Sequence, residues 1–337
     1  MIPEQVKNYS PDSVKKIFLQ NPSTIMAEFN EMQTQFLAIR YKMNGNIESS
    51  NILTLLGKGL HLEILRIREK ILNFDISLKN FLKMNDYIKK NIDSFNHGYK
   101  IVSIVKKTGI PKETVRRKLK KLIENKIISY DKKNKLYSYN LSSKNEPLFN
   151  NFISKDIHAL ARFVLCITNA MQLRLNLKDV ENEIKNEFSF YYFHYYKCQL
   201  AWMKMWQDKV KDIDLIFISL QALIPTLKNK KYINGSIENI HNVIGKSDIK
   251  KYDVNNTIGA SSISDISGIP RATCVRKLEK LVKLGMLEKD KYSKRYYVNQ
   301  NTAERTEHIL KKDNVLQTIT IFSDFLSTML SSLIKKK

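Results

Sequence analysis

Residues 101–140 read IVSIVKKTGIPKETVRRKLKKLIENKIISYDKKNKLYSYN, and residues 260–299 read ASSISDISGIPRATCVRKLEKLVKLGMLEKDKYSKRYYVN. Aligned without a gap at an offset of 159 residues (from 101 to 260), about 16 of these 40 positions are identical, and most of the others exchange like for like. Since the offset is close to half of the 337-residue chain, the simplest interpretation is an internal duplication of a whole unit. These segments are called the first and the second repeat.

A Gly-Ile-Pro turn in the first repeat separates two predicted helices. Gly109 can adopt the positive φ that ends a helix sharply, and Pro111 fits the first turn of the next helix, where its missing N–H costs nothing. Apolar residues such as Val115 and Leu119 recur at helical spacing over 111–125, so they predict an inward stripe. The outward face is then mostly basic. It comprises Lys112, Glu113, Thr114, Arg116, Arg117, Lys120 and Lys121.

The second repeat follows the same plan around Gly268 and Pro270. Its predicted outward face is less basic than that of the first repeat. It includes Arg271, Thr273, Val275, Arg276, Lys277 and Lys280, with Glu279 among them.

A β-hairpin is predicted after each of these helices, because short alternating runs flank a polar tip. The strands are expected at 127–130 and 136–140, and again at 286–289 and 295–299. Basic residues gather at the tips and along the second strands. They are Lys132, Lys133, Lys135, Lys291, Lys294 and Arg295.

The string Gly-Ile-Pro-x-x-Thr-Val-Arg-Arg-Lys-Leu-x-x-Leu at 109–122 resembles the winged helix-turn-helix of bacterial transcriptional regulators. The resemblance covers the two repeats, about a quarter of the chain, and departs from the pattern at Cys274 and Val275. It implies a mainly α fold with two winged helix-turn-helix units, each a three-helix core plus a β-hairpin wing, embedded in long flanking helices. It also implies double-stranded DNA as partner, with the second helix of each unit in the major groove and the wing lysines against phosphates.

The two predicted reading helices differ at positions that bear on base recognition. Arg116 of the first repeat is matched by Val275, and Lys120 by Glu279. An arginine can read guanine through O6 and N7, whereas a valine can at most contact a thymine methyl group. We therefore expect the two units to prefer different bases.

Five regions are expected along the chain. They are an N-terminal helical region (1–75), the first winged domain (76–145), linking helices with an aromatic-rich segment (146–212), the second winged domain (213–300) and a C-terminal amphipathic helix (301–337). Long helices are predicted over 12–43 and 50–92, one or two long helices over 178–229, and a short one near 236–243.

The aromatic run FSFYYFHYYKCQLAWMKMW at 188–206 is too dense for one face of a helix, so we expect it to be covered on several sides. A helix packed between the halves or at a dimer interface is the main interpretation. The alternatives are a base-stacking surface or an effector pocket lined by Tyr191, Tyr195, Trp202 and Trp206.

Charge and composition bound the function class. The chain carries 57 Lys and Arg against 33 Asp and Glu, a net charge of +24, which indicates nucleic acid first and an anionic membrane surface second. The apolar stretch 315–334 is too rich in polar residues for a membrane span. Its stripe instead predicts a core or dimer helix. The first residues lack the pattern of a secretory signal, so a cytoplasmic location is expected.

No metal, cofactor or enzymatic activity is expected. Cys166, Cys198 and Cys274 lie far apart in apolar patterns, which predicts buried thiols instead of a zinc site or a disulfide framework. The histidines show no ligand spacing, and no phosphate-binding loop or catalytic constellation stands out. The sequence therefore favours a transcriptional regulator, with the flanking helices suited to a homodimer. A plasmid- or phage-type replication initiator and an architectural DNA-binding protein are the alternatives. Nothing identifies an effector.

Overall fold

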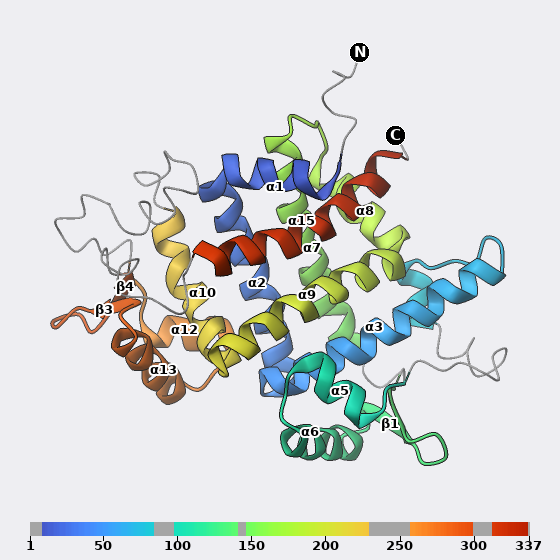
Figure 1. The fold of residues 1–337 in the computed structure, drawn as a ribbon, viewed down its shortest axis with the longest axis horizontal. Helices are drawn as coiled ribbons and strands as arrows, with labels where there is room; N and C mark the ends of the chain where they lie inside the picture. The colour runs from blue at the N-terminus through green and yellow to red at the C-terminus, as the bar shows by residue number, and fades with distance from the viewer. Residues whose placement is uncertain (1–8, 84–97, 141–145, 229–256, 299–311, 336–337) are drawn as a thin grey trace.

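The computed structural model describes residues 9–83, 98–140, 146–228, 257–298 and 312–335 (Figure 1). Within these ranges the fold is mainly helical, and the strands form two small two-stranded sheets. The short helix expected near 236–243 lies outside the described residues. So does the end of the helix expected over 50–92, from residue 84 on.

The first half of the chain contains six described helices and one hairpin. They are α1 (Pro11–Gln20), α2 (Pro22–Asn44), α3 (Ile47–Lys70), α5 (Ile101–Thr108), α6 (Lys112–Glu124), β1 (Ile128–Asp131), β2 (Leu136–Tyr139) and α7 (Glu146–Ala170).

The second half presents the same order of elements over its described residues. They are α8 (Leu177–Asn186), α9 (Phe188–Val210), α10 (Ile213–Lys228), α12 (Ala260–Ser267), α13 (Arg271–Lys283), β3 (Leu287–Lys289), β4 (Tyr296–Val298) and α15 (Lys312–Lys335).

Helices outside the repeats correspond at a different offset from the repeats themselves. The long helices α2 and α9 start 166 residues apart, at Pro22 and Phe188, and both have 23 residues. The pair α1 and α8 has the same offset, and in each the buried side chains are the fourth and eighth of the helix. The repeats keep the offset of 159, because 54 residues separate the start of α3 from that of α5 (47 to 101), whereas 47 separate the start of α10 from that of α12 (213 to 260).

Two of the predicted helices are interrupted. The run 12–43 is divided into α1 and α2 at Asn21, because Pro22 lacks the N–H and has the ring that a helix interior does not tolerate. The run 178–229 is divided at Glu187 and again at Lys211, which has a left-handed φ of 57°. A third predicted helix, 50–92, is also interrupted: it is observed from 47 to 70 as α3, and residues 78–83 are again helical.

Each half covers the long helix of the other half. Helix α2 packs against α7 of its own half and against α10, while α9 packs against α15 and against α3. The exchange extends to the short helices, since α1 lies on α15 and α8 lies on α7. In Figure 1, α3 and α10 accordingly lie on opposite sides of the central helices α2 and α9.

Matching aromatic pairs join α2 and α9 at the centre. The rings of Phe29 and Trp202 meet edge to face at 6.3 Å, and those of Phe36 and Tyr195 at 5.4 Å. At the offset of 166, Phe29 corresponds to Tyr195 and Phe36 to Trp202, so the two contacts are equivalent. Such pairs add about 0.5–1.5 kcal/mol beyond the burial of their surface. The two long helices therefore contact each other through matching positions.

The aromatic run lies in this core. Tyr191, Tyr195, Trp202 and Trp206 of α9 are all buried. Helix α15 is also a core element, with Ile319 and Phe322 fully buried. Two of the cysteines are buried, Cys166 is half-buried, and all three are free thiols. Within the described residues, no helix combines the length and the apolar character needed to cross a membrane.

The exchanged packing predicts that neither half is stable alone. Residues 1–172 lack α9 and α10, so α2 and α3 would each expose a large part of their buried surface, a loss of about 25 cal/mol for each Å². We expect this fragment to unfold without a cooperative transition by circular dichroism. Co-expression with residues 173–337 should restore cooperative unfolding. A cooperative transition of the isolated fragment would contradict the observed packing.

Candidate nucleic-acid interface

The turn between the two helices has the same geometry in both repeats. Gly109 and Gly268 end α5 and α12 with φ of 72° and 78°. Just before the glycine, Thr108 donates a hydrogen bond from Oγ1 to Ile104 O at 2.7 Å, and its oxygen accepts one from Ile110 N at 3.3 Å. Ser267 makes the same two bonds in the second repeat. Each bent helix pair is thus fixed by backbone and hydroxyl contacts.

The hairpins also agree in detail. In β1–β2, Ile128 pairs with Tyr139, and in β3–β4, Leu287 pairs with Val298. One further bridge extends each hairpin, from Tyr99 to Tyr137 and from Ile258 to Tyr296.

An aspartate shapes the tip of each hairpin. Asp131 accepts hydrogen bonds from the backbone N–H groups of Lys133 at 2.8 Å and Asn134 at 3.2 Å. Asp290 does the same for Tyr292 and Ser293. The hydrogen bonds from Asn134 hold the pKa of Asp131 below its ordinary value. These turns present the tip side chains to solvent.

The first repeat exposes nearly the whole predicted face of α6. Arg116 lies 2.8 Å from Glu113, both in solvent, and Thr114 is half-buried. An exposed pair of this kind contributes little to stability, so the arginine can exchange partners readily. The remaining predicted residues are exposed. They are Lys112, Arg117, Lys120 and Lys121 on the helix and Lys132, Lys133 and Lys135 on the hairpin.

The second repeat binds several of its predicted site residues to the protein itself. Lys277 was expected on the outward face, but its side chain is only 13% exposed and lies 2.5 Å from Asp212, at the start of α10. The expected outward placement of Lys277 is therefore wrong. Its equivalent in the first repeat, Lys118, pairs with Glu48 of α3 at 3.2 Å. This position of each repeat attaches the helix to the scaffold.

Other predicted residues of the second repeat are also engaged. Lys280 reaches the same Asp212 at 3.4 Å. Arg295 donates from Nε to Thr257 Oγ1 at 2.6 Å and from Nη2 to the Thr257 carbonyl oxygen. Arg271 donates to Ser261 Oγ at 3.0 Å. Lys280 and Arg271 remain exposed, but both of these charges also contact groups of the protein itself.

Glu279 links the second repeat's helix to its hairpin. Its Oε1 accepts hydrogen bonds from Lys289 Nζ at 2.5 Å and from Tyr296 hydroxyl at 2.8 Å. The equivalent residue of the first repeat, Lys120, is exposed. Among the other predicted residues, Thr273 and Val275 are half-buried, while Arg276, Lys291 and Lys294 are exposed.

The hairpin tips carry a difference that the sequence reasoning missed. Tyr292 occupies the second tip at the position of Lys133 in the first and is 95% exposed. Both positions were read as part of a generally basic tip. A gap-free alignment of the repeats pairs Tyr292 with Lys133. Tyr292 is the only aromatic residue in either tip between the aspartate and the second strand.

Lysines from both repeats meet carboxylates of the scaffold where α3 and α10 begin. Asp214 faces Lys277 of the second repeat and Lys118 of the first, together with Glu48 and Asp212. Burial is the main reason that the pKa of Asp214 is raised to about 6. The charges of Glu48 and Asp212 also act to raise this pKa, whereas those of Lys277 and Lys118 act to lower it. Burial is the largest single effect on Asp212, but hydrogen bonds from Lys277 and the Leu215 N–H, together with the charges of Lys277 and Lys280, outweigh it and lower the pKa of Asp212.

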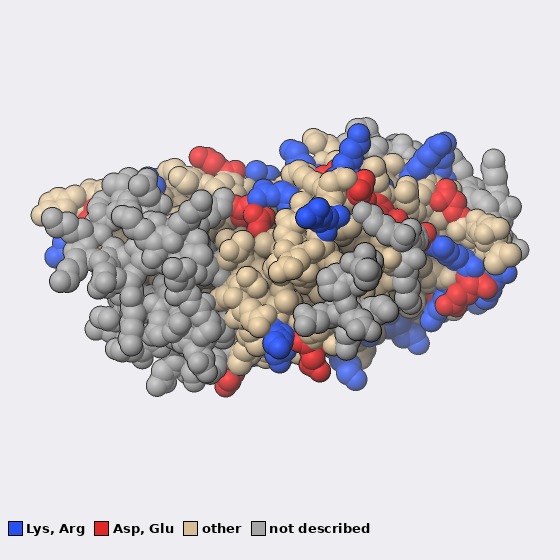
Figure 2. Space-filling model, turned by 90° about the horizontal axis from the view of Figure 1, so that it is seen from above, with Lys and Arg blue, Asp and Glu red and all other residues tan. Residues whose placement is uncertain are grey.

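Both repeats lie on the lower side of the molecule in Figure 1, with α13 at the left and α6 near the centre. Figure 2 views the molecule from the other side, from above. There the described surface has an uncharged central area with acidic and basic side chains interspersed around it.

Comparison with protein-family models, with curated proteins and with solved structures finds no match to this chain. No group of three or more His, Cys, Asp or Glu suited to a metal ion occurs among the residues that the structure describes.

Asp214→Asn should stabilise the protein at pH 7. A carboxyl group whose pKa is raised by folding stabilises the native state below its unfolded pKa, near 4, and this contribution is lost as the pH rises through about 6. The neutral amide avoids the loss, so the free energy of unfolding should increase by roughly 2 kcal/mol at pH 7 and remain unchanged at pH 4. Urea denaturation between pH 4 and 8 measures both.

Asp212→Asn is the matched control, since its carboxylate has a lowered pKa and binds Lys277. Its contribution is present above the unfolded pKa and is lost as the pH falls, so this substitution should destabilise at pH 7. If both substitutions changed the free energy of unfolding equally at each pH, burial would not distinguish the carboxyl groups of Asp212 and Asp214.

Proposed function

We propose that this protein binds double-stranded DNA sequence-specifically through two winged helix-turn-helix units, as a transcriptional regulator, and that the units arose by internal duplication. The observation that carries this proposal is the outward face of α6. Arg116, Arg117, Lys120 and Lys121 are exposed on one short helix that follows a glycine turn. A helix of this length spans about 20 Å and fits the major groove.

The hairpins supply the backbone contacts in this proposal. Lys132, Lys133 and Lys135 project from a tip that Asp131 holds in a tight turn. Contacts of this kind with phosphates fix the position of a protein on DNA and dominate its affinity, but they do not read sequence. The net charge of +24 favours the same partner.

A single chain would present both units to one duplex. The repeats lie on the same side of the described molecule, and their helices are attached through equivalent contacts to α3 and α10. If α6 and α13 enter successive major grooves, their sites are about 34 Å apart, one helical turn. A homodimer is not required for two-site binding and remains a separate expectation, as does a cytoplasmic location.

The units should contribute unequally. The second repeat commits Lys277 and Lys280 to Asp212, and Glu279 stands where the first repeat has a free-standing lysine. We therefore expect α13 to contribute less affinity than α6 and to read bases through fewer charged contacts. Tyr292 at the second tip is suited to insertion at a minor-groove base step.

Two other DNA-binding functions are compatible with the same surface. A replication initiator would bind several copies of one site at an origin. An architectural protein would bind duplexes of unrelated sequence with equal affinity. Selection of bound sequences from random duplex DNA separates these outcomes, since a regulator should return one site made of two unequal half-sites. Enrichment of no sequence would contradict the proposed specificity and favour the architectural function.

Arg116→Ala should relax base preference at about one position and weaken binding to the selected site by roughly 1–3 kcal/mol. Lys133→Ala should weaken binding to every duplex alike and reduce the slope of log affinity against log salt by about one. Fluorescence anisotropy titrations at several salt concentrations measure both effects.

Lys16→Ala is the matched charge control, because Lys16 is exposed on α1, on the side away from the repeats. It should leave affinity for the selected site nearly unchanged. If all three substitutions weaken binding equally and without change in base preference, α6 is not the reading helix.

A further inference from the structure

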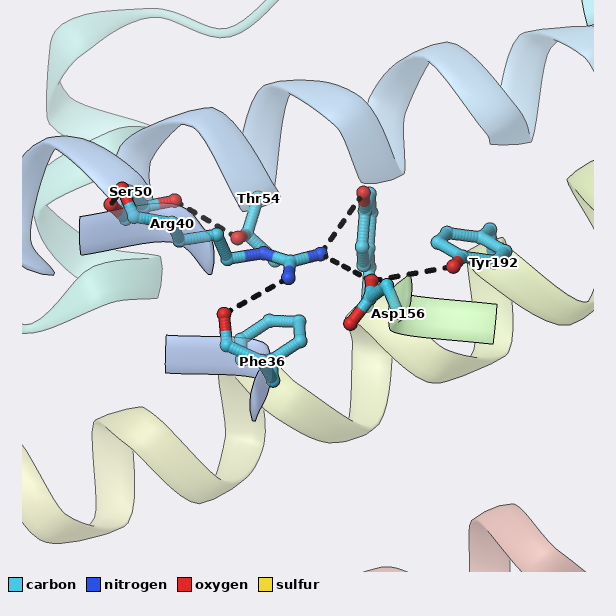
Figure 3. A network of polar contacts seen from close by, with 7 residues as sticks. Phe36, Arg40, Ser50, Thr54, Asp156 and Tyr192 are labelled. Carbon is cyan, nitrogen blue, oxygen red and sulfur yellow. Dashed lines mark hydrogen bonds and ion pairs between the residues drawn. The ribbon is translucent and has the colours of Figure 1, made fainter. Parts of the chain in front are cut away.

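An ion pair is buried between α2 and α7 of the first half (Figure 3). Arg40 donates from Nη2 to Asp156 Oδ2 at 2.9 Å and from Nη1 to the Phe36 carbonyl oxygen at 3.1 Å. Tyr192 of α9 donates its hydroxyl to the same Asp156 oxygen at 3.3 Å. One carboxylate oxygen is therefore shared by two donors, and the guanidinium lies at the junction of helices from both halves.

A pocket that is open to solvent lies beside this pair. Its rings come from four separate segments and include Phe81, Tyr139, Phe152 and Tyr196. Asp156 and His61 also line the pocket, and both are at least 98% buried. Asp156 Oδ1 and His61 Nδ1 have no hydrogen-bond partner among the described residues. Leaving such an acceptor unpaired in the interior costs about 1–3 kcal/mol, and a ligand that hydrogen-bonds to it would remove this cost.

The second half shows that the fold does not require these polar groups. At the offset of 166, Arg40 corresponds to Trp206 and Asp156 to Phe322, both buried. Ser50 and Thr54, on the α3 wall of the pocket, correspond to Ile216 and Leu220 of α10. Apolar side chains therefore fill the equivalent space. Because a buried ion pair is at best weakly stabilising relative to such packing, its presence in one half alone calls for a role other than stability.

We propose that this pocket binds a small, uncharged, planar molecule that carries an N–H donor beside a carbonyl acceptor, as in an aromatic amide. Asp156 Oδ1 accepts the N–H, and an N–H of Arg40 donates to the carbonyl. The charges of the pair cancel, so an ionic ligand would lose its hydration without a countercharge. The aromatic walls fit a flat ring.

His61 is compatible with an uncharged ligand. Burial lowers the pKa of His61 to about 3, so the imidazole is neutral at physiological pH. Its ring stacks on Phe81 at 4.9 Å, which keeps it at the pocket wall. The pocket thus holds no net charge from its titratable groups, and selectivity comes from hydrogen-bond geometry.

Tyr139 places the pocket in contact with the first hairpin, since it is the last residue of β2. The test of this site is nevertheless independent of the proposed function, because ligand binding is measured without DNA. A failure to bind ligand would leave DNA binding unaffected, and the reverse also holds.

Benzamide, benzoate and toluene test the proposed chemistry with one ring size. Calorimetric titration of the full chain should give saturable binding of benzamide with a dissociation constant of roughly 1 mM or lower, a normal value for so small a ligand. Benzoate, which lacks the donor and is anionic, and toluene, which has no polar group, should bind at least about tenfold more weakly. No saturable binding of benzamide, or equal binding of all three compounds, would overturn the proposal.

Two substitutions locate the binding. Thr54→Leu installs the residue of the second half and fills the pocket, and Asp156→Asn replaces the acceptor with an amide of the same shape. Each should weaken benzamide binding about tenfold or more, with cooperative unfolding as the check on folding. If benzamide binds either folded variant as tightly as the native protein, the site is elsewhere and the assignment is wrong. The comparison of ligands on the native protein decides the chemistry even if neither variant folds.

Discussion

Helices α2 and α9 bury side chains around most of their circumference, and the rest of the architecture depends on covering them. The half to which each belongs supplies α7 or α15 for one side only. The other side is covered by α10 or α3 from the opposite half. The equivalent ring contacts of Phe29 with Trp202 and Phe36 with Tyr195 join α2 to α9. Two interdigitated halves are thus one cooperative unit, and the orientation of each repeat follows from a core that both halves build.

The repeats are carried on this core by charges as well as by packing. The first turns of α3 and α10 offer Glu48 and Asp212, and each receives a lysine from the helix above it, Lys118 or Lys277. Helices α12 and α5 also contact α2 and α9 of the opposite half, and the glycines that follow them lie close to Lys42 and Asp208. A cation that anchors a helix in this way is not available to a partner. The difference between the repeats therefore comes partly from the scaffold and not only from the exposed residues.

The sequence predicts well what short-range chemistry determines. The turn at Gly109, the inward stripe beginning at Val115 and the hairpin strands appear within one or two residues of their expected positions, because glycine, proline and apolar spacing act locally. The mainly helical class is confirmed for the described residues. In contrast, the position of Lys277 depends on Asp212, which is remote in the chain, and no spacing rule links the two. The pair of Arg40 and Asp156 was missed for the same reason, since each residue alone reads as a surface charge on an amphipathic helix.

The two offsets, 166 in the helices and 159 in the repeats, show that the halves differ in the length of chain between their long helices and their repeats. The halves also differ in content, with an ion pair in one and Trp206 and Phe322 at its place in the other. A dimer of identical chains looks the same from its two ends, and a duplex bound to it has no preferred direction. A covalently joined pair whose halves differ has a front and a back. Bound to an extended polymer, such a molecule would mark which way along the polymer it points.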